Sequence, residues 1–319
     1  MTAVLFFFGV IIPYIAVLIF VIGIIYRVWK WARSPVPFRI PTTCGQQKTL
    51  PWIKANNLEN PSNTVGVIGR MALEVLLFRS LLRNTTTELK QGVRKLVYKD
   101  SLLLWLGALL FHWSLLIILL RHSKFFLEPV PSFLLLFERW DGILQVSLPS
   151  WFPSMLPILF ISNIVILLAL TYLLLRRVLT SQIRYISLPA DYLVVLLILG
   201  VVTSGILTKF FFKVDIVGVK ALALGVITFQ PSVPADGIGL FFYIHLFLIC
   251  TLIAYFPFSK LMHMPGIFLS PTRNLANTNR ISRHINPWDK PVKVHTYEEW
   301  EDEFRDVMKD AGLPLEKEQ

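Results

Sequence analysis

Four histidines lie inside or at the ends of strongly apolar stretches of this chain. They are His112, His122, His245 and His263. An ionisable side chain at membrane depth is energetically costly, so each of them is a candidate functional group that needs a partner. Haem iron is a suitable partner, because neutral imidazole is a strong axial ligand and two imidazoles close both axial positions. Two such pairs would hold two haems and form an electron carrier.

Long apolar helices are needed to hold these side chains, and the composition provides them. The chain of 319 residues is 55% hydrophobic and only 16% charged, with a mean hydropathy of +0.61, which is too apolar for an ordinary soluble domain. A helix needs about 20 apolar residues to span a bilayer. Five segments come close to this length: 3–25, 102–120, 156–175, 192–207 and 239–258. We therefore predict an all-α integral membrane protein, a five-transmembrane-helix bundle in the cell membrane.

The distribution of Lys and Arg predicts the orientation of the bundle. Residues 33–100 hold eleven of them, the 176–188 loop holds three and the tail from Lys260 holds nine. The residues before the first span hold none, and the 121–149 and 209–237 loops hold three each. Because an excess of positive charge marks the cytoplasmic side, we expect the N-terminus outside and the C-terminus in the cytoplasm. The net charge of +11 then reflects membrane topology, and no nucleic acid is expected as a partner.

Four regions follow from these observations. Residues 1–32 are predicted to form the first transmembrane helix, 33–100 a cytoplasmic segment, 101–268 a four-helix haem-binding membrane region and 269–319 a cytoplasmic partner-binding tail. The cytoplasmic segment contains apolar residues at helical spacing with charged residues between them. The apolar ones are Val65, Ile68, Met71, Ala72, Val75, Leu76 and Leu82, and the charged ones are Arg70, Glu74, Arg79 and Arg83. This pattern predicts an amphipathic helix that lies on the membrane surface or docks a subunit.

The tail contains a second amphipathic pattern. Tyr297, Trp300, Phe304 and Met308 recur at helical spacing among acidic residues. The pattern predicts a short amphipathic helix that binds a partner, and a solvated tail is the alternative.

Helix parity predicts how the four histidines pair. The second and fifth spans run in opposite directions, so His112 is expected to face His263 and His122 to face His245. The ten residues between the first two histidines rise about 15 Å and the eighteen between the last two about 27 Å, so tilt or a distorted helix end must absorb the difference. Eighteen residues make five whole turns, which would return His263 to the helix face of His245. The His122 and His245 haem is then expected near the outer surface, and the other nearer the cytoplasm.

Other functions remain open at this stage. Each histidine taken singly could be a hydrogen-bonded core residue or an interfacial one. The cysteines, Cys44 and Cys250, belong to no CxxC or CxxCH pattern, so the sequence does not indicate iron–sulfur ligation, covalently attached haem or a disulfide between them. A proton-coupled transporter would use the histidines as a relay, although the internal repeats and matching helix breaks of such proteins are not clear here. A haem-free membrane anchor for a soluble enzyme is the third alternative.

The histidine spacing resembles that of the gamma-subunit type cytochrome b of respiratory nitrate reductase. In that family, ligands ten residues apart on helix two pair with ligands eighteen apart on helix five, and the stretch Phe256-Pro-Phe-Ser-Lys-Leu-Met-His263 is similar to the family's end of helix five. The resemblance runs roughly from the first helix to Phe268. The segment before helix two and the tail near Ile285 are similar to the DsrM branch of sulfate-reducing organisms, also described as the cytochrome b subunit of an Hdr-like menaquinol oxidoreductase.

The resemblance implies a function and a set of partners. It implies two haem b groups at the four matched histidines, with menaquinone or menaquinol as the membrane substrate. It also implies a quinol-linked oxidoreductase subunit of sulfate or sulfite respiration that acts within a complex. The implied partners are a cytoplasmic iron–sulfur subunit resembling heterodisulfide reductase, an extracytoplasmic multihaem cytochrome c and other membrane subunits.

A quinone also needs polar groups beside a haem edge. Near His122 the candidates are Arg121, Lys124, Arg139 and Asp141, with Glu138 beside them. Interfacial anchoring is the alternative role for all of them. For the arginines, pairing with haem propionates is a further alternative. On the inner side, Arg184 and Lys260 could pair with the propionates of the other haem.

Overall fold

The computed structural model describes residues 2–34, 45–83, 85–90, 95–142, 160–212, 214–234, 237–278, 280 and 294–316. Three features that the sequence singled out lie outside these residues. They are Cys44, the start of the tail near Ile285 and residues 156–159 of the third predicted span.

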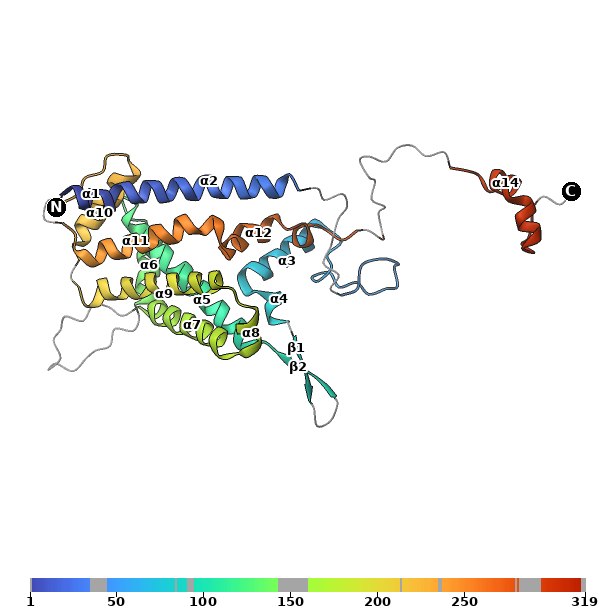
Figure 1. The fold of residues 1–319 in the computed structure, drawn as a ribbon, viewed down its shortest axis with the longest axis horizontal. Coiled ribbons are helices and arrows are strands. Elements are labelled where there is room, and N and C mark those ends of the chain that lie inside the picture. The colour runs from blue at the N-terminus through green and yellow to red at the C-terminus, as the bar shows by residue number, and fades with distance from the viewer. Residues whose placement is uncertain are drawn as a thin grey trace.

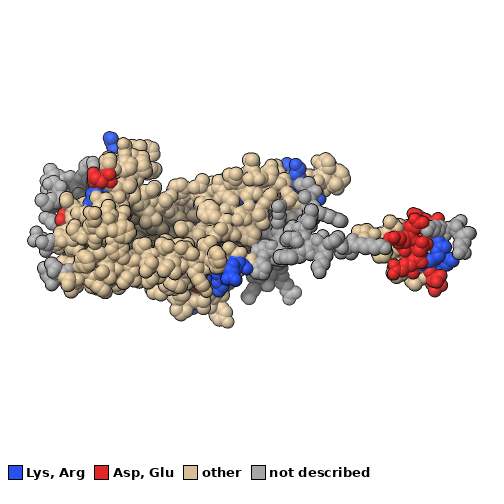
Figure 2. Space-filling view, turned by 90° about the horizontal axis from the view of Figure 1, so that it is seen from above, with Lys and Arg blue, Asp and Glu red and all other residues tan. Residues whose placement is uncertain are grey.

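Five long apolar helices make up the body of the molecule (Figure 1). They span Ala3–Ala32, Leu102–Phe125, Ile161–Leu179, Pro189–Phe210 and Leu240–Phe258, and each is long and apolar enough to cross a membrane. Figure 2 shows one side of the bundle, where the surface between the charged groups at its two ends is almost free of charge, as a surface facing lipid requires. The chain is a multi-pass membrane protein, as the sequence predicted.

The five spans consist of the following elements. The first contains α1 (Thr2–Phe6), a π-helical turn η1 (Phe7–Ile11) and α2 (Ile12–Ala32). The second is α5 (Leu102–His122) with η2 (Ser123–Phe125), the third is α7 (Ile161–Leu179) and the fourth is α9 (Pro189–Phe210). The fifth is α11 (Leu240–Tyr255) with η3 (Phe256–Phe258).

Shorter elements connect or extend the spans. They are α3 (Thr64–Leu77), α4 (Arg79–Leu82), α6 (Ser132–Asp141), α8 (Ser181–Ile186), α10 (Ile216–Ile227), η4 (Lys260–Met262), α12 (His263–Leu269), α13 (Pro271–Asn274) and α14 (Tyr297–Asp310).

One correction to the all-α prediction concerns the segment before α5. Strands β1 (Thr85–Lys90) and β2 (Lys95–Asp100) form an antiparallel hairpin in which Thr85 pairs with Asp100. Threonine, valine and tyrosine in these strands favour extended structure.

The spans pack in a fixed order around the bundle. Helix α5 packs on α7, α7 on α9, α9 on α11, and α11 on α2. A core of Ile166, Leu170 and Ile198 joins α7 and α9, with apolar residues of α5 against it. Within the described residues, α5 and α11 are not in extensive contact. Helices α7 and α9 therefore lie between α5, which carries His112 and His122, and α11, which carries His245.

Glycines allow two of these helix contacts to be very close. A Cβ atom added at Gly23 of α2 would lie 2.6 Å from Cβ of Pro257, and one at Gly107 of α5 would lie 2.7 Å from Cδ1 of Tyr172. Small residues at such crossings let helix backbones approach in membranes, where packing drives association. Gly23 thus fixes α2 against the end of α11, and Gly107 fixes α5 against α7.

The fifth helix does not continue to His263, so the prediction of five unbroken turns was wrong. Helix α11 ends at Tyr255, and two 3₁₀ turns around Pro257 and Ser259 precede α12, which begins at His263. Proline lacks the N–H that a continuing helix needs. The Ser259 side chain accepts a hydrogen bond of 3.1 Å from the backbone N–H of Leu261 and so starts the second turn. The distorted end that the unequal histidine spacing requires lies here.

The amphipathic helix predicted near residue 65 is present but bent. It begins at Asn63, whose side chain accepts a hydrogen bond from the Gly66 N–H, and it breaks at Phe78, which has a φ of 49°. Beyond the bend, Arg79 bonds to Glu59, and Arg273 bonds to the Ser80 hydroxyl at 2.8 Å. The bend therefore joins α4 to the preceding segment and to α13.

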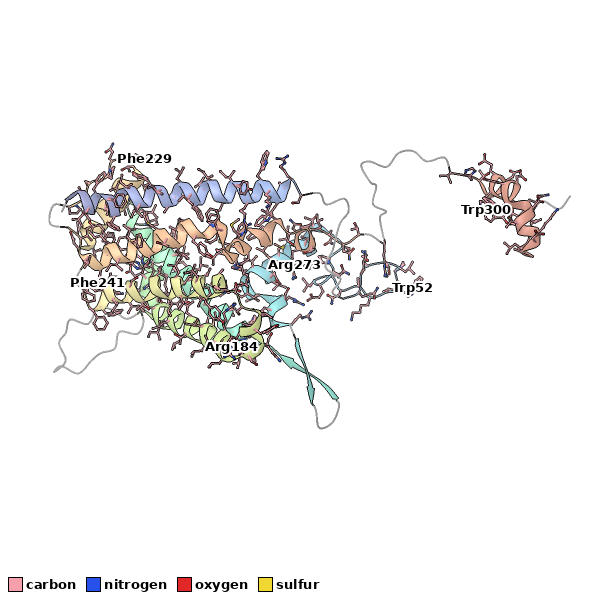
Figure 3. The ribbon with its side chains drawn as sticks, viewed as in Figure 1. Trp52, Arg184, Phe229, Phe241, Arg273 and Trp300 are labelled. Atoms are coloured by element: carbon pink, nitrogen blue, oxygen red, sulfur yellow. The ribbon has the colours of Figure 1, made fainter. Side chains whose placement is uncertain are left out.

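The tail helix α14 is also present at the predicted position. Thr296 and Glu299 form a capping box at its start. Tyr297, Trp300 and Phe304 form a row of adjacent aromatic rings that stay 40–47% exposed (Figure 3 labels Trp300). The chain after the helix folds back, where the Glu316 N–H donates to the buried Glu301 carboxylate.

The α2 contact can be tested by filling the space at Gly23. Gly23→Ala is expected to destabilise the protein by about 1–3 kcal/mol, because the rigid Pro257 ring cannot move aside. Gly200→Ala is the control, since its added Cβ would meet nothing closer than Leu248 Cδ1 at 3.8 Å. Thermal unfolding of both variants in the same detergent measures the difference, and equal melting temperatures would contradict the close contact.

Candidate membrane histidine site

The structure brings His112 and His263 together. Their ring centroids lie 6.0 Å apart and the ring planes are nearly perpendicular, at 88°. Two imidazoles that bind opposite sides of one metal ion have facing nitrogens about 4 Å apart, since each metal–nitrogen bond is about 2 Å. A centroid separation of 6.0 Å is compatible with that arrangement.

The other two histidines lie on α5 and α11. His122 is the last residue of α5, and His245 lies one turn and a half into α11. The two rings are close enough to interact electrostatically. His112 and His245 are half-buried, whereas His122 and His263 are exposed at helix ends. The contact between the His112 and His263 rings fits the pairing that helix parity predicts, and the pairing of His122 with His245 stays a prediction.

Hydrogen bonds leave the same ring nitrogen available in all four histidines. Nδ1 lies 2.7 Å from the Ala108 oxygen in His112, 2.7 Å from the Ile118 oxygen in His122 and 2.8 Å from the Lys260 oxygen in His263. A carbonyl oxygen only accepts, so each Nδ1 carries the proton and each Nε2 keeps its lone pair. A hydrogen bond from the other ring nitrogen to a protein oxygen is the usual arrangement for a metal-binding histidine.

His245 reaches the same state through a serine. Its Nδ1 lies 2.9 Å from the Ser204 hydroxyl of α9, and that hydroxyl donates to the Val201 carbonyl at 3.0 Å. Because the single hydroxyl proton is used, the Ser204 oxygen accepts from Nδ1–H. The next residue is Gly205, where an added Cβ would lie 3.0 Å from Cε1 of His245. The sequence analysis missed both residues, although a Ser-Gly pair inside an apolar span is a signal of close helix approach.

The α3–α4 bend adds an aromatic wall beside His112. The Phe78 ring lies 4.8 Å from the His112 ring, and Phe111 lies at the same distance. Indole N–H groups of α5 hold the bend in place, because Trp105 donates to the Leu77 carbonyl at 2.7 Å and Trp113 to the Leu76 carbonyl at 3.0 Å. A segment outside the five spans therefore shapes the space around a membrane histidine.

A buried ionic network surrounds the end of α5 next to His122. Arg121 forms an ion pair of 3.0 Å with Asp141 and donates to the Asn163 side chain at 2.9 Å. Asp141 also accepts from the N–H and the hydroxyl of Ser162, at 2.8 and 2.6 Å. Arg121 and Asp141 are 6% and 8% exposed, so the ion pair is shielded from solvent. The network ties α5, α6 and α7 together at this end of the bundle.

Lys209 of α9 joins the same cluster and was not predicted. Its ammonium lies 3.2 Å from the centre of the Phe160 ring, and the Arg121 guanidinium lies 3.7 Å from the same ring. Lys124 pairs with Glu138 at 2.6 Å. Three cations thus share two carboxylates beside His122, which leaves an excess positive charge. A lysine two residues from the end of an apolar span was the signal in the sequence.

The remaining predicted polar residues lie elsewhere. Arg139, the fourth quinone candidate, is exposed on α6. Lys260 pairs with Asp191 at 2.6 Å, and Arg177 lies 3.5 Å from the same carboxylate. Arg184 is exposed on α8, at the edge of the bundle in Figure 3. The structure therefore brings together three of the four quinone candidates and leaves Arg139 and Arg184 outside the clusters.

The fold and the site define a multi-pass membrane protein with histidines on its second and fifth spans and on the short helix that follows the fifth. A family model described as the nitrate reductase gamma subunit matches residues 66–284, which include all four histidines. The chain belongs to the nitrate reductase gamma subunit family.

Two curated relatives are similar over most of their length. The chain is 46% identical over 288 residues to the Hdr-like menaquinol oxidoreductase cytochrome b-like subunit of Archaeoglobus fulgidus, which covers 88% of this chain and 83% of the relative. It is 42% identical over 283 residues to the protein of the same name from Archaeoglobus profundus, with coverage of 87% and 81%.

The position of His245 can be tested through Gly205. Gly205→Val is expected to push the imidazole away from Ser204, because the added atoms would occupy the space of the ring. The expected result is a melting temperature below that of the wild type, measured by thermal unfolding in detergent. Gly200→Val, on the same helix but facing Leu248, is the control. Equal melting temperatures of the two variants would show that the ring does not depend on this contact.

Proposed function

We propose that this chain is the dihaem cytochrome b subunit of a membrane complex and transfers electrons between menaquinol and a cytoplasmic iron–sulfur partner. The observation that carries the proposal is the pair His112 and His263, with ring centroids 6.0 Å apart and each Nδ1 bound to a backbone carbonyl. The second pair, His122 and His245, would hold the second haem b in the same way. Each haem would supply an iron that takes up and releases one electron.

The residues of this chain would orient the ligands and compensate charge. The backbone carbonyls and Ser204 hold each imidazole with Nε2 available. The Arg121, Lys124 and Lys209 cluster would pair with an anionic oxygen beside His122, from a haem propionate or a quinone. The nearby Asp141 and Glu138 carboxylates are acceptors that could receive protons from a quinol.

The membrane orientation belongs to the proposal as well. Lys and Arg are most numerous in residues 33–100 and in the tail, which supports an N-terminus outside and a C-terminus in the cytoplasm. His122 and His245 would then lie near the outer surface, and His112 and His263 nearer the cytoplasm. Electrons from menaquinol would cross the membrane inward. The direction fits delivery to a cytoplasmic partner.

The names of the two relatives support menaquinol as the substrate and a larger complex as the context. We propose a heterodisulfide reductase-like iron–sulfur subunit as the cytoplasmic partner, with α14 in the tail as its docking arm. An extracytoplasmic multihaem cytochrome c and other membrane subunits complete the proposed complex, with a role in sulfate or sulfite respiration.

Haem content tests the dihaem proposal directly. The purified protein is expected to contain two b-type haems per chain, and His112→Ala and His122→Ala are each expected to lose a different one, because each removes one ligand of one pair. Reduced-minus-oxidised visible spectra and redox titration distinguish the two haems. A colourless protein would contradict the proposal and favour a membrane anchor or a transporter.

Charge removal tests the cluster beside His122. Lys209→Gln is expected to shift the reduction equilibrium of the haem at His122 about tenfold toward the oxidised form, because a nearby positive charge stabilises the reduced haem. Arg139→Gln removes the same charge on the same side but from an exposed position, and it is the control. Redox titration monitored at the absorption band of each haem gives both values. Equal shifts in the two variants would contradict a specific role for Lys209.

A further inference from the structure

A pocket of about 620 Å³ lies where three of the spans reach the same end of the bundle. Its walls come from the last turns of α2, the first turn of α9 and the chain from Tyr255 to Gly266. The volume is within the range of small-molecule sites, about 300–1,000 Å³. No residue of α5 lines the pocket, but His263 does, so the pocket borders the space between His112 and His263. Its position at helix ends places it at the level of lipid headgroups.

Arg27 supplies an unsatisfied donor to this pocket. Its Nε atom is buried and has no hydrogen-bond partner among the described residues. A buried guanidinium nitrogen without an acceptor is costly, so a ligand with anionic oxygens would remove an existing penalty. The guanidinium group suits phosphate oxygens in particular, because its donors match their geometry.

The other charged groups of the pocket do not cancel this preference. Asp191 is the one carboxylate among the lining residues, and it is already paired with Lys260 at 2.6 Å and lies 3.5 Å from Arg177. Its second oxygen accepts from the Leu188 N–H at 3.1 Å. The carboxylate is therefore fully engaged, and Arg27 gives the pocket a net positive charge.

The apolar walls and the surroundings indicate that the ligand is a lipid. Trp31, Tyr255 and Phe258 line the pocket, and aromatic residues of this kind concentrate at membrane interfaces. The outer face of α2 is exposed along its length, for example at Ile25 (61%) and Trp29 (63%), as a lipid-facing helix requires. Basic pockets between transmembrane helices bind anionic headgroups.

We propose that this pocket binds the phosphate group of an anionic phospholipid through Arg27, with the acyl chains along α2. The site would join α2 to α9 and to the turn that carries His263. The pocket borders the proposed haem site at His263, and the lipid proposal rests on Arg27 and on the apolar walls.

The test compares three variants of the full-length, haem-loaded protein in detergent. Native mass spectrometry counts bound phosphatidylglycerol and phosphatidylcholine, each added at the same series of concentrations. The wild type is expected to bind one phosphatidylglycerol per chain with at least about tenfold preference, and Arg27→Gln to lose about tenfold in that affinity. Arg33→Gln, which removes the same charge from an exposed position on the next turns, is expected to bind like the wild type.

Further measurements on the same samples separate the other sources of an anionic oxygen. If Arg27 instead contacts a haem propionate, Arg27→Gln would change the haem spectrum or content while lipid binding stays unchanged, and the proposal would fail. Millimolar inorganic phosphate that displaces the lipid completely would show a free-phosphate site. If Arg27→Gln loses a bound menaquinone analogue but retains lipid binding, the pocket is a quinone site and the proposal fails. If Arg27→Gln does not fold, Arg27→Lys takes its place in the test. This variant keeps the charge without the buried Nε, and it is expected to bind phosphatidylglycerol with an intermediate affinity.

Discussion

The cost of placing imidazole side chains at membrane depth is the constraint on which this structure depends. Each of the four histidines lies in or next to an apolar span, and each has its Nδ1 bound to an oxygen of the chain. These bonds satisfy Nδ1 of each imidazole and leave Nε2 with its lone pair. Helices α7 and α9 lie between α5 and α11 in the packing order of the bundle.

Contacts outside the histidines maintain the same geometry. The Arg121 and Asp141 ion pair fixes the end of α5 to α6 and α7, and the indoles of Trp105 and Trp113 fix the α3–α4 bend beside His112. Gly205 permits the ring of His245 to lie against α9. Small residues and polar clusters therefore do the positioning that a hydrophobic effect cannot do between helices in lipid.

The membership of the nitrate reductase gamma subunit family agrees with this arrangement, since the matched residues 66–284 contain all four histidines. The first span and the tail helix α14 lie outside the matched region. They carry two features with separate roles in our proposals, the Arg27 pocket on α2 and the exposed aromatic row on α14. A common electron-transfer core could thus be adapted to a particular membrane and partner by the ends of the chain.

The sequence by itself determined the five spans and the four histidines, because hydrophobic length and intramembrane polar residues are local signals. Helix parity predicts that His112 faces His263, and the centroids of these two rings lie 6.0 Å apart in the structure. The break of helix five at Pro257, the β1–β2 hairpin and the roles of Ser204, Lys209 and Phe78 were decided by tertiary structure. Arg139 and Lys209 show the reason: both are basic residues near a span end, and only the packing of α6 and α9 turns one outward and the other toward Arg121. A uniformly apolar sequence contains no local signal that predicts how a helix is rotated about its axis.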